Sequence, residues 1–175
     1  MDAAAATHDS PMIIALKLFA VFVLVLLNGF FVAAEFALVK IRDTQLEPLI
    51  RKGSRSARVT RKIVGNLDAS LSACQLGITL ASLGLGMYGE HALAGFIDRG
   101  FGHDAVPNPA ATATVLSLGL LTILHIVVGE MVPKGLALQR PERMIRLAHL
   151  PMRVMLFALY PFVAVSNRMA RLCLA

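Results

Sequence analysis

Three long runs of apolar residues, separated by charged or turn-forming segments, dominate the hydrophobic pattern of the chain. Each is close to the 20 or so mainly apolar residues that a helix needs to cross the roughly 30 Å hydrocarbon layer of a bilayer. The second run is the weakest because it is rich in glycine, and the third follows the turn-forming sequence VPNP. The pattern predicts three membrane-spanning helices, at residues 13–39, 68–90 and 111–132.

A fourth apolar segment, Val154–Asn167, has 14 uncharged residues and contains Pro161. This length suits a helix on the membrane surface better than a helix that crosses the bilayer. We therefore expect an amphipathic juxtamembrane helix at residues 144–172, lying along the inner interface. The predicted fold class is an all-α integral membrane protein with three transmembrane helices and this additional helix.

The distribution of Lys and Arg predicts the orientation, because these residues accumulate in cytoplasmic loops. Eight of them lie between the first and second runs and seven follow the third, whereas only Arg99 lies between the second and third. The N-terminus is therefore expected outside and the C-terminus in the cytoplasm, with residues 1–11 as a disordered extracytoplasmic segment. The basic connection at 40–62 is expected to lie against anionic lipid of the inner leaflet.

Composition supports a membrane protein. The 175 residues are 57% hydrophobic and only 16% charged, whereas soluble domains have roughly 45–50% apolar and about 25% charged residues. The net charge of +6 raises nucleic-acid binding as an alternative, but the chain has no zinc-ligand spacing, no Trp and only two Tyr for base stacking. We expect no nucleic-acid partner, and no enzyme, because no nucleophile–base or phosphate-loop pattern is present.

The first run must also be tested as a cleaved signal peptide, since Val32-Ala33-Ala34 resembles a cleavage site. Its apolar stretch exceeds the usual core of about 7–15 residues, and the leader carries Asp2 and Asp9 instead of an early basic region. The cations that follow the run would also resist translocation. We therefore interpret it as a transmembrane helix.

Polar residues recur along one stripe of the second predicted helix, at steps of three or four. The stripe consists of Asp68, Ser72, Gln75, Thr79, Ser82 and Gly86. In lipid such a stripe should face another helix or a polar cavity. Helix–helix packing through small and hydroxyl residues and ligation of an ion both remain open interpretations.

The other two helices also carry isolated polar groups. Asn28 and Glu35 are seven residues apart and share a face of the first helix, and His125 lies in the third. Glu35 either acts as a ligand or extends to the interface and pairs with a basic residue. His125 either bridges helices or binds an ion.

Glu130 ends a run of residues, 105–129, without any Asp, Glu, Lys or Arg. Pro133 cannot donate a hydrogen bond to the carbonyl of Gly129, so we expect the helix to break or kink at these residues. A freed carbonyl beside a carboxylate offers the hard oxygen ligands that Mg²⁺ and Ca²⁺ prefer. The alternative is an ordinary helix end at which Lys134 neutralises Glu130.

The segments NGFFVAAEFALVKIR (28–42), QLGITLASLGLG (75–86) and HIVVGEMVPKGLAL (125–138) occur in this order. Together they resemble the transmembrane domain of the CorC/CNNM family, which also appears under hemolysin-related names. The resemblance covers about residues 12–172, and the Gly-Glu-x-x-Pro-Lys motif combined with the other two segments makes it specific. Nothing in the sequence resembles a pore-forming toxin.

The resemblance implies that residues 12–175 form a homodimeric domain of three transmembrane helices and a juxtamembrane helix in a bacterial-type inner membrane. Family members are linked to Mg²⁺ efflux coupled to Na⁺ entry. Full-length members continue into cytoplasmic CBS domains that bind ATP, often followed by a small C-terminal domain. These domains are absent from this chain, so we expect it to be the membrane part of a longer protein.

In the family, a first-helix serine, a second-helix asparagine, the motif glutamate and backbone carbonyls hold Mg²⁺. Only the glutamate is unchanged, as Glu130, because Ala33-Ala34 occupies the position expected for the serine and Thr79 that of the asparagine. The resemblance therefore implies either a rebuilt metal site or a changed ion preference. The rebuilt site would use Glu130, Thr79, Gln75 and the Gly129 carbonyl, and Asn28, Glu35, Ser82 and His125 are candidates for a secondary or coupling-ion site.

The predicted function is a dimeric exporter of divalent cations, with Mg²⁺ favoured and Na⁺ as a coupling ion. The alternative is a non-transporting membrane module that anchors cytoplasmic regulatory domains or a partner. A Mg²⁺ signal beside Glu130 would favour the exporter. Pairing of Lys134 with Glu130 in tightly closed helices would favour the anchor.

Overall fold

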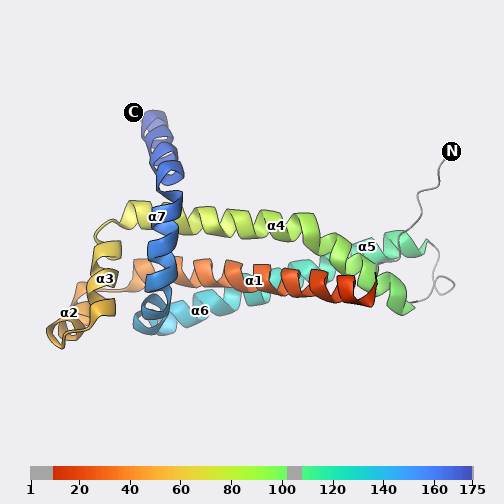
Figure 1. The fold of residues 1–175 in the computed structure, drawn as a ribbon, viewed down its shortest axis with the longest axis horizontal. Helices are drawn as coiled ribbons and strands as arrows, with labels where there is room; N and C mark the ends of the chain where they lie inside the picture. The colour runs from red at the N-terminus through yellow and green to blue at the C-terminus, as the bar shows by residue number, and fades with distance from the viewer. Residues whose placement is uncertain (1–9, 102–107, 175) are drawn as a thin grey trace.

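The computed structural model describes residues 10–101 and 108–174, which are helical apart from short turns (Figure 1). Within these two ranges there is no strand, which confirms the all-α prediction. Of the predicted disordered segment 1–11, residues 1–9 lie outside the described part. The helices are α1 (Pro11–Lys40), α2 (Asp43–Arg51), α3 (Arg55–Val64), α4 (Leu67–Phe101), α5 (Pro109–Leu124), the π-helix η1 (His125–Met131), α6 (Val132–Gln139) and α7 (Pro141–Leu174).

Helix α1 has well-formed ends. The Ser10 hydroxyl accepts a hydrogen bond from the N–H of Ile13 at 3.4 Å, and Pro11 occupies the first turn, where its missing N–H has no cost. The helix ends after Lys40 because Ile41 adopts an extended backbone.

In the part of the chain that the structure describes, three helical stretches are long and apolar enough to cross a membrane. They correspond to the three predicted transmembrane helices, and each is longer than the sequence indicated. Helix α4 continues past Glu90 because a helix can leave the apolar layer without losing its backbone hydrogen bonds. The stretches are Pro11–Lys40, Leu67–Ala94 and Ala111–Gln139.

The third stretch is a continuous helix made of α5, η1 and α6. The sequence predicted a break or kink between Gly129 and Pro133, and the structure has a π-helical segment at that place. In this wider turn the N–H of Val132 donates to the carbonyl of Val127, five residues back. The backbone at Met131 and Val132 stays in the right-handed helical region, so the chain passes Pro133 without leaving the helix.

The basic connection between the first two spans folds into α2 and α3, two short helices that the hydrophobic pattern did not predict. Gly53, at φ 83°, makes the turn between them, in a conformation that favours glycine. Helix α7 includes the predicted juxtamembrane residues 144–172 and runs across α1 and α4 (Figure 1). Helices α2, α3 and α7 lie at one end of the long helices, and the end of α4 and the start of α5 lie at the other end (Figure 1).

Buried apolar side chains form two clusters along the bundle. One lies where α2, α3 and α7 cover one end of α1 and α4, and includes Leu46, Ile145 and Met152. The other joins α1, α4 and α5 and includes Val25 and Leu85. The first cluster gives α7 a fixed position across the bundle.

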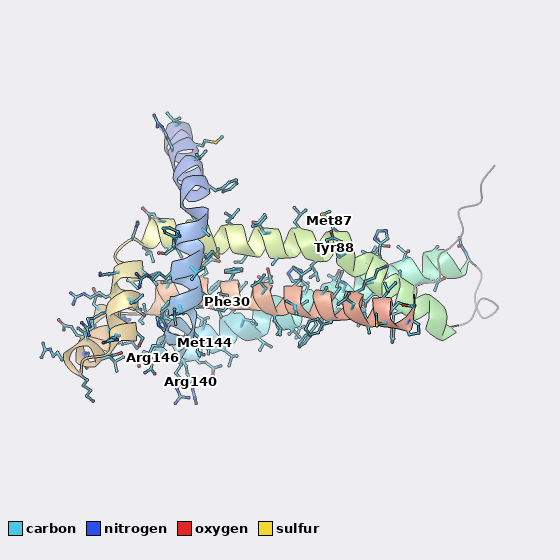
Figure 2. The ribbon with its side chains drawn as sticks, viewed as in Figure 1. Phe30, Met87, Tyr88, Arg140, Met144 and Arg146 are labelled. Carbon is cyan, nitrogen blue, oxygen red and sulfur yellow. The ribbon has the colours of Figure 1, made fainter. Side chains whose placement is uncertain are left out.

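Large apolar side chains also cover the outside of the three long helices, where water would make them costly and lipid would not. Leu16 and Val115 are each more than 60% exposed. Figure 2 shows Met87 and Tyr88 on α4, both exposed, far from Arg140 at the end where α7 begins. This distribution fits a bundle whose sides face lipid and whose basic end lies at a membrane surface.

Glycine allows α1 and α4 to approach closely. A Cβ atom added to Gly77 would lie 2.6 Å from the ring of Phe31, which is buried against α4. A Cβ atom added to Gly86, nine residues further along α4, would meet nothing within 4 Å. The two glycines are therefore matched sites in one helix, one packed and one open.

We expect Gly77→Ala to lower the free energy of unfolding by about 1–3 kcal/mol, because the buried Phe31 ring must move. Gly86→Ala should leave stability unchanged or raise it by up to about 1 kcal/mol, since alanine favours a helix. Thermal unfolding of both variants in the same detergent, followed by circular dichroism, tests this. Equal melting temperatures would contradict the close α1–α4 contact.

Candidate functional site

A chain of polar contacts joins the three long helices at Asn28, whose side chain is only 2% exposed. Its amide nitrogen donates a hydrogen bond to the carbonyl of Gly129 at 3.0 Å. Its amide oxygen accepts a hydrogen bond from the hydroxyl of Ser82 at 3.2 Å. Asn28 therefore uses both ends of its amide to hold α1 against α4 and η1.

Pro133 explains why the Gly129 carbonyl needs a donor from another helix. In a regular α-helix that carbonyl would accept from the N–H four residues later, but residue 133 is a proline and has none. The π-turn instead directs the preceding N–H, that of Val132, to Val127. Asn28 supplies a donor to the Gly129 carbonyl from α1, and in a membrane such a donor satisfies a group that water cannot reach.

Two glycines make room for this contact. A Cβ atom on Gly29 would lie 2.9 Å from Cγ of Pro133. A Cβ atom on Gly129 would lie 2.9 Å from Cδ2 of His125 and 3.3 Å from the amide nitrogen of Asn28. The proline ring and the asparagine amide thus both pack against backbone, and His125 lies beside the same glycine.

Glu130 follows the buried Gly129 but is itself exposed, with 53% of its side chain accessible. Its Oε1 is 3.9 Å from Nζ of Lys134, one turn later in α6. The Lys134 ammonium also lies 4.5 Å from the ring centre of Phe36 and interacts electrostatically with Glu35. Lys134 therefore pairs with the carboxylate of η1 and lies in the electrostatic range of a carboxylate of α1.

The stripe on α4 divides between two environments. Ser82 reaches Asn28, whereas Gln75 and Thr79 are exposed, and the Thr79 hydroxyl donates to the carbonyl of Gln75 within its own helix at 2.8 Å. In the described residues no hydrogen bond links Glu130 to either of these two side chains. Seen from one chain, the residues predicted as metal ligands lie on the outside of the helices, apart from Gly129.

The described part of the chain has no group of three or more His, Cys, Asp or Glu side chains that could hold a metal. The predicted ligand set contains only one such residue, Glu130, and otherwise relies on neutral oxygens. The Gly129 carbonyl has a second lone pair that Asn28 leaves free. Neutral oxygens and one carboxylate suit an ion that keeps part of its hydration shell, as Mg²⁺ does.

Comparison with known proteins identifies the family. The model of the Cyclin M transmembrane N-terminal domain, CNNM, matches residues 18–175. UPF0053 protein YhdT of Bacillus subtilis (strain 168) is 41% identical over 152 residues, which are 86% of this chain and 33% of that protein. UPF0053 protein YhdP of the same organism is 38% identical over 158 residues, 89% of this chain and 36% of that protein.

A third relative, the uncharacterized protein Rv1841c of Mycobacterium tuberculosis (strain ATCC 25618 / H37Rv), is 41% identical over 143 residues, 82% of this chain and 41% of that protein. The described residues form an all-helical fold with three helices able to span a membrane, and the matches agree with it. The chain is therefore an all-helical membrane domain. The chain belongs to the CNNM family and forms its transmembrane domain. It spans about a third of the length of the curated relatives YhdT and YhdP.

Sequence reasoning singled out Asn28 and Ser82 but did not pair them with each other or with Gly129. A signal for the pairing was present, because Pro133 leaves the Gly129 carbonyl without a donor and Asn28 is the only amide side chain in the first span. The contact between Gly29 and Pro133 was missed because periodicity within one helix carries no information about which helix it meets.

Replacing Asn28 by leucine should lower the free energy of unfolding by about 1–3 kcal/mol, because the Gly129 carbonyl would stay buried without a partner. The exposed amide of Gln75 is the matched control, and Gln75→Leu should change stability by less than about 0.5 kcal/mol. Thermal unfolding in detergent measures both. A smaller loss for Asn28→Leu than for Gln75→Leu would refute the role of the amide.

Proposed function

We propose that this domain exports divalent cations, Mg²⁺ above others, across a bacterial-type inner membrane. The observation that carries the proposal is the segment around Gly129, where a carboxylate follows a carbonyl freed by proline in a membrane-length apolar helix. Family membership supports it through the sequence resemblance described above. Homodimer formation and coupling to Na⁺ belong to the same proposal.

In this proposal Glu130 supplies the charge that attracts the ion, and the second lone pair of the Gly129 carbonyl supplies a neutral ligand. Gln75 and Thr79 would act through water, since neither contacts Glu130 and Mg²⁺ usually keeps several of its waters. The π-turn supports movement at this place, because such turns are single-turn irregularities that occur often at functional sites. A shift of η1 would expose the ion to the other side of the membrane.

Na⁺ would use the polar contact beside this site. Asn28 and Ser82 offer neutral oxygens in a buried position, and His125 lies next to Gly129. Hard oxygen ligands suit an alkali cation, and breaking the contact between Asn28 and Gly129 would alter the divalent-ion site at the same carbonyl. Glu35 would join the coupling site through its electrostatic interaction with Lys134, the partner of Glu130.

A second candidate function, a membrane anchor without transport, is favoured by the pairing of Glu130 with Lys134 at 3.9 Å. In that case the lysine is the permanent counter-ion of the carboxylate. The anchored part would be the remaining two thirds of a longer protein, for which the resemblance implies ATP-binding CBS domains. The distance weakens this reading, since 3.9 Å is too long for a direct hydrogen bond between the ammonium and the carboxylate.

Glu130→Gln should abolish Mg²⁺ export, because the site loses its only charge while the side chain keeps its size. Liposomes reconstituted with the chain and loaded with Mg²⁺ measure the flux, with and without a Na⁺ gradient, and with Ca²⁺, Mn²⁺ or Co²⁺ in place of Mg²⁺. The exposed carboxylate of Glu47 on α2 is the control, and Glu47→Gln should export as the unchanged chain does.

Two results would decide between the candidates. Export that survives Glu130→Gln would reject the site assignment. The exporter would be rejected in favour of the anchor if the unchanged chain moved none of the four ions. Its melting temperature should then equal that of both variants, which shows that the chain is folded.

Lys134→Gln should tighten Mg²⁺ binding roughly fivefold, because a positive charge at the Glu130 carboxylate in a watery environment opposes a second cation by about 1 kcal/mol. Titration calorimetry in detergent compares this variant with Lys40→Gln. This control removes a cation from the C-terminal end of α1 instead of from α6. If Lys134→Gln binds Mg²⁺ no more tightly than Lys40→Gln, the lysine does not compete with the ion.

A further inference from the structure

A cavity of about 260 Å³ lies between α3, the turn into α4 and the middle of α7, apart from the contacts around Asn28. Lys62 of α3 and Arg153 of α7 both line it. The two residues are 91 positions apart in the sequence, and the packing of α7 against α3 places them at one opening.

These two cations have no partner of opposite charge in the part of the chain that the structure describes. No Asp or Glu is among the residues that line the cavity. Two like charges held around one cavity repel each other, and an anion between them would remove this repulsion and gain hydrogen bonds to both. The electrostatics of the cavity therefore favour a bound anion.

The remaining walls are partly polar and partly apolar. Asn66 also lines the cavity and immediately precedes α4, whose first N–H groups and helix dipole favour an anion. The Ser70 hydroxyl is already committed, since it donates to the carbonyls of Ile63 and Asn66 at 2.9 Å. Val59 and Leu156 supply apolar surface. This combination suits a ligand with a charged group next to a hydrocarbon part.

The size and position of the cavity narrow the choice of ligand. It is smaller than the roughly 300–1,000 Å³ of pockets that enclose a drug-sized molecule. It lies at the end of the bundle where α2, α3 and α7 gather (Figure 1) and where Arg140 and Arg146 also lie (Figure 2). The excess of Lys and Arg assigns this end to the cytoplasmic leaflet, where basic pockets between helices bind anionic headgroups.

We propose that this cavity binds the phosphodiester headgroup of an anionic phospholipid, with Lys62 and Arg153 on the phosphate and the acyl chains remaining in the bilayer. The lipid would join α3, α4 and α7 at their meeting point. This is a defined site with its own ligands, distinct from a general attraction of the basic end to the membrane surface.

The test compares two double variants of the same charge change in the same two helices. Lys62→Gln/Arg153→Gln removes both cations of the cavity, and Arg61→Gln/Arg143→Gln removes two cations that do not line it. The full chain is purified in detergent with equal amounts of palmitoyl-oleoyl phosphatidylglycerol and phosphatidylcholine, and bound lipid is counted by native mass spectrometry. We expect roughly tenfold less phosphatidylglycerol on the cavity variant, and less than about a twofold change on the control.

Several results would overturn the proposal. Equal losses of phosphatidylglycerol in the two double variants would mean a general attraction to the basic surface. If the unchanged chain retained phosphatidylcholine as well as phosphatidylglycerol, the cavity would not select for the charge of the lipid. Displacement of the lipid by millimolar inorganic phosphate would assign the cavity to free phosphate. Loss of lipid in Lys62→Arg/Arg153→Lys, which keeps both charges, would mean that packing holds the lipid instead.

Discussion

The hydrogen bond from the Asn28 amide to the Gly129 carbonyl is the contact on which the arrangement of the three long helices depends. A carbonyl without a partner is costly in a membrane, and Pro133 creates one by removing the N–H that would have paired with it. In the structure the Asn28 side chain of α1 donates to this carbonyl. Ser82 then fills the other end of the same amide and brings α4 into the contact. The three helices thus share one polar centre.

This centre also determines what surrounds the candidate ion site. Gly129 is buried because Asn28 and His125 pack against it, whereas Glu130, one residue later, turns outward to Lys134. In the proposed exporter the same carbonyl would serve two purposes, with one lone pair for helix packing and the other for the ion. Movement of α1 against η1 would therefore change the position of the Gly129 carbonyl at the ion site directly.

At the basic end of the bundle, the groups that packing brings together are cations. There the long helices stop, and α2, α3 and α7 close the apolar cluster around Leu46 and Met152 while directing many cations outward. Packing that buries the apolar faces of α3 and α7 also brings Lys62 and Arg153 to one cavity. An anionic membrane surface at the same level would offset the repulsion between these two cations.

The sequence by itself determined the number of helices that can span a membrane, the family and the place where Pro133 disturbs the third helix, because these follow from apolar length and local motifs. It also singled out Asn28 and Ser82 as candidates for an ion site, since polar groups are rare in such helices. Only the tertiary structure decided that these two meet Gly129, that Gln75 and Thr79 lie on the outside, and that the basic connection folds into α2 and α3. These outcomes depend on contacts between distant segments, and periodicity along one helix cannot tell which neighbour a face will meet or whether it will meet one at all.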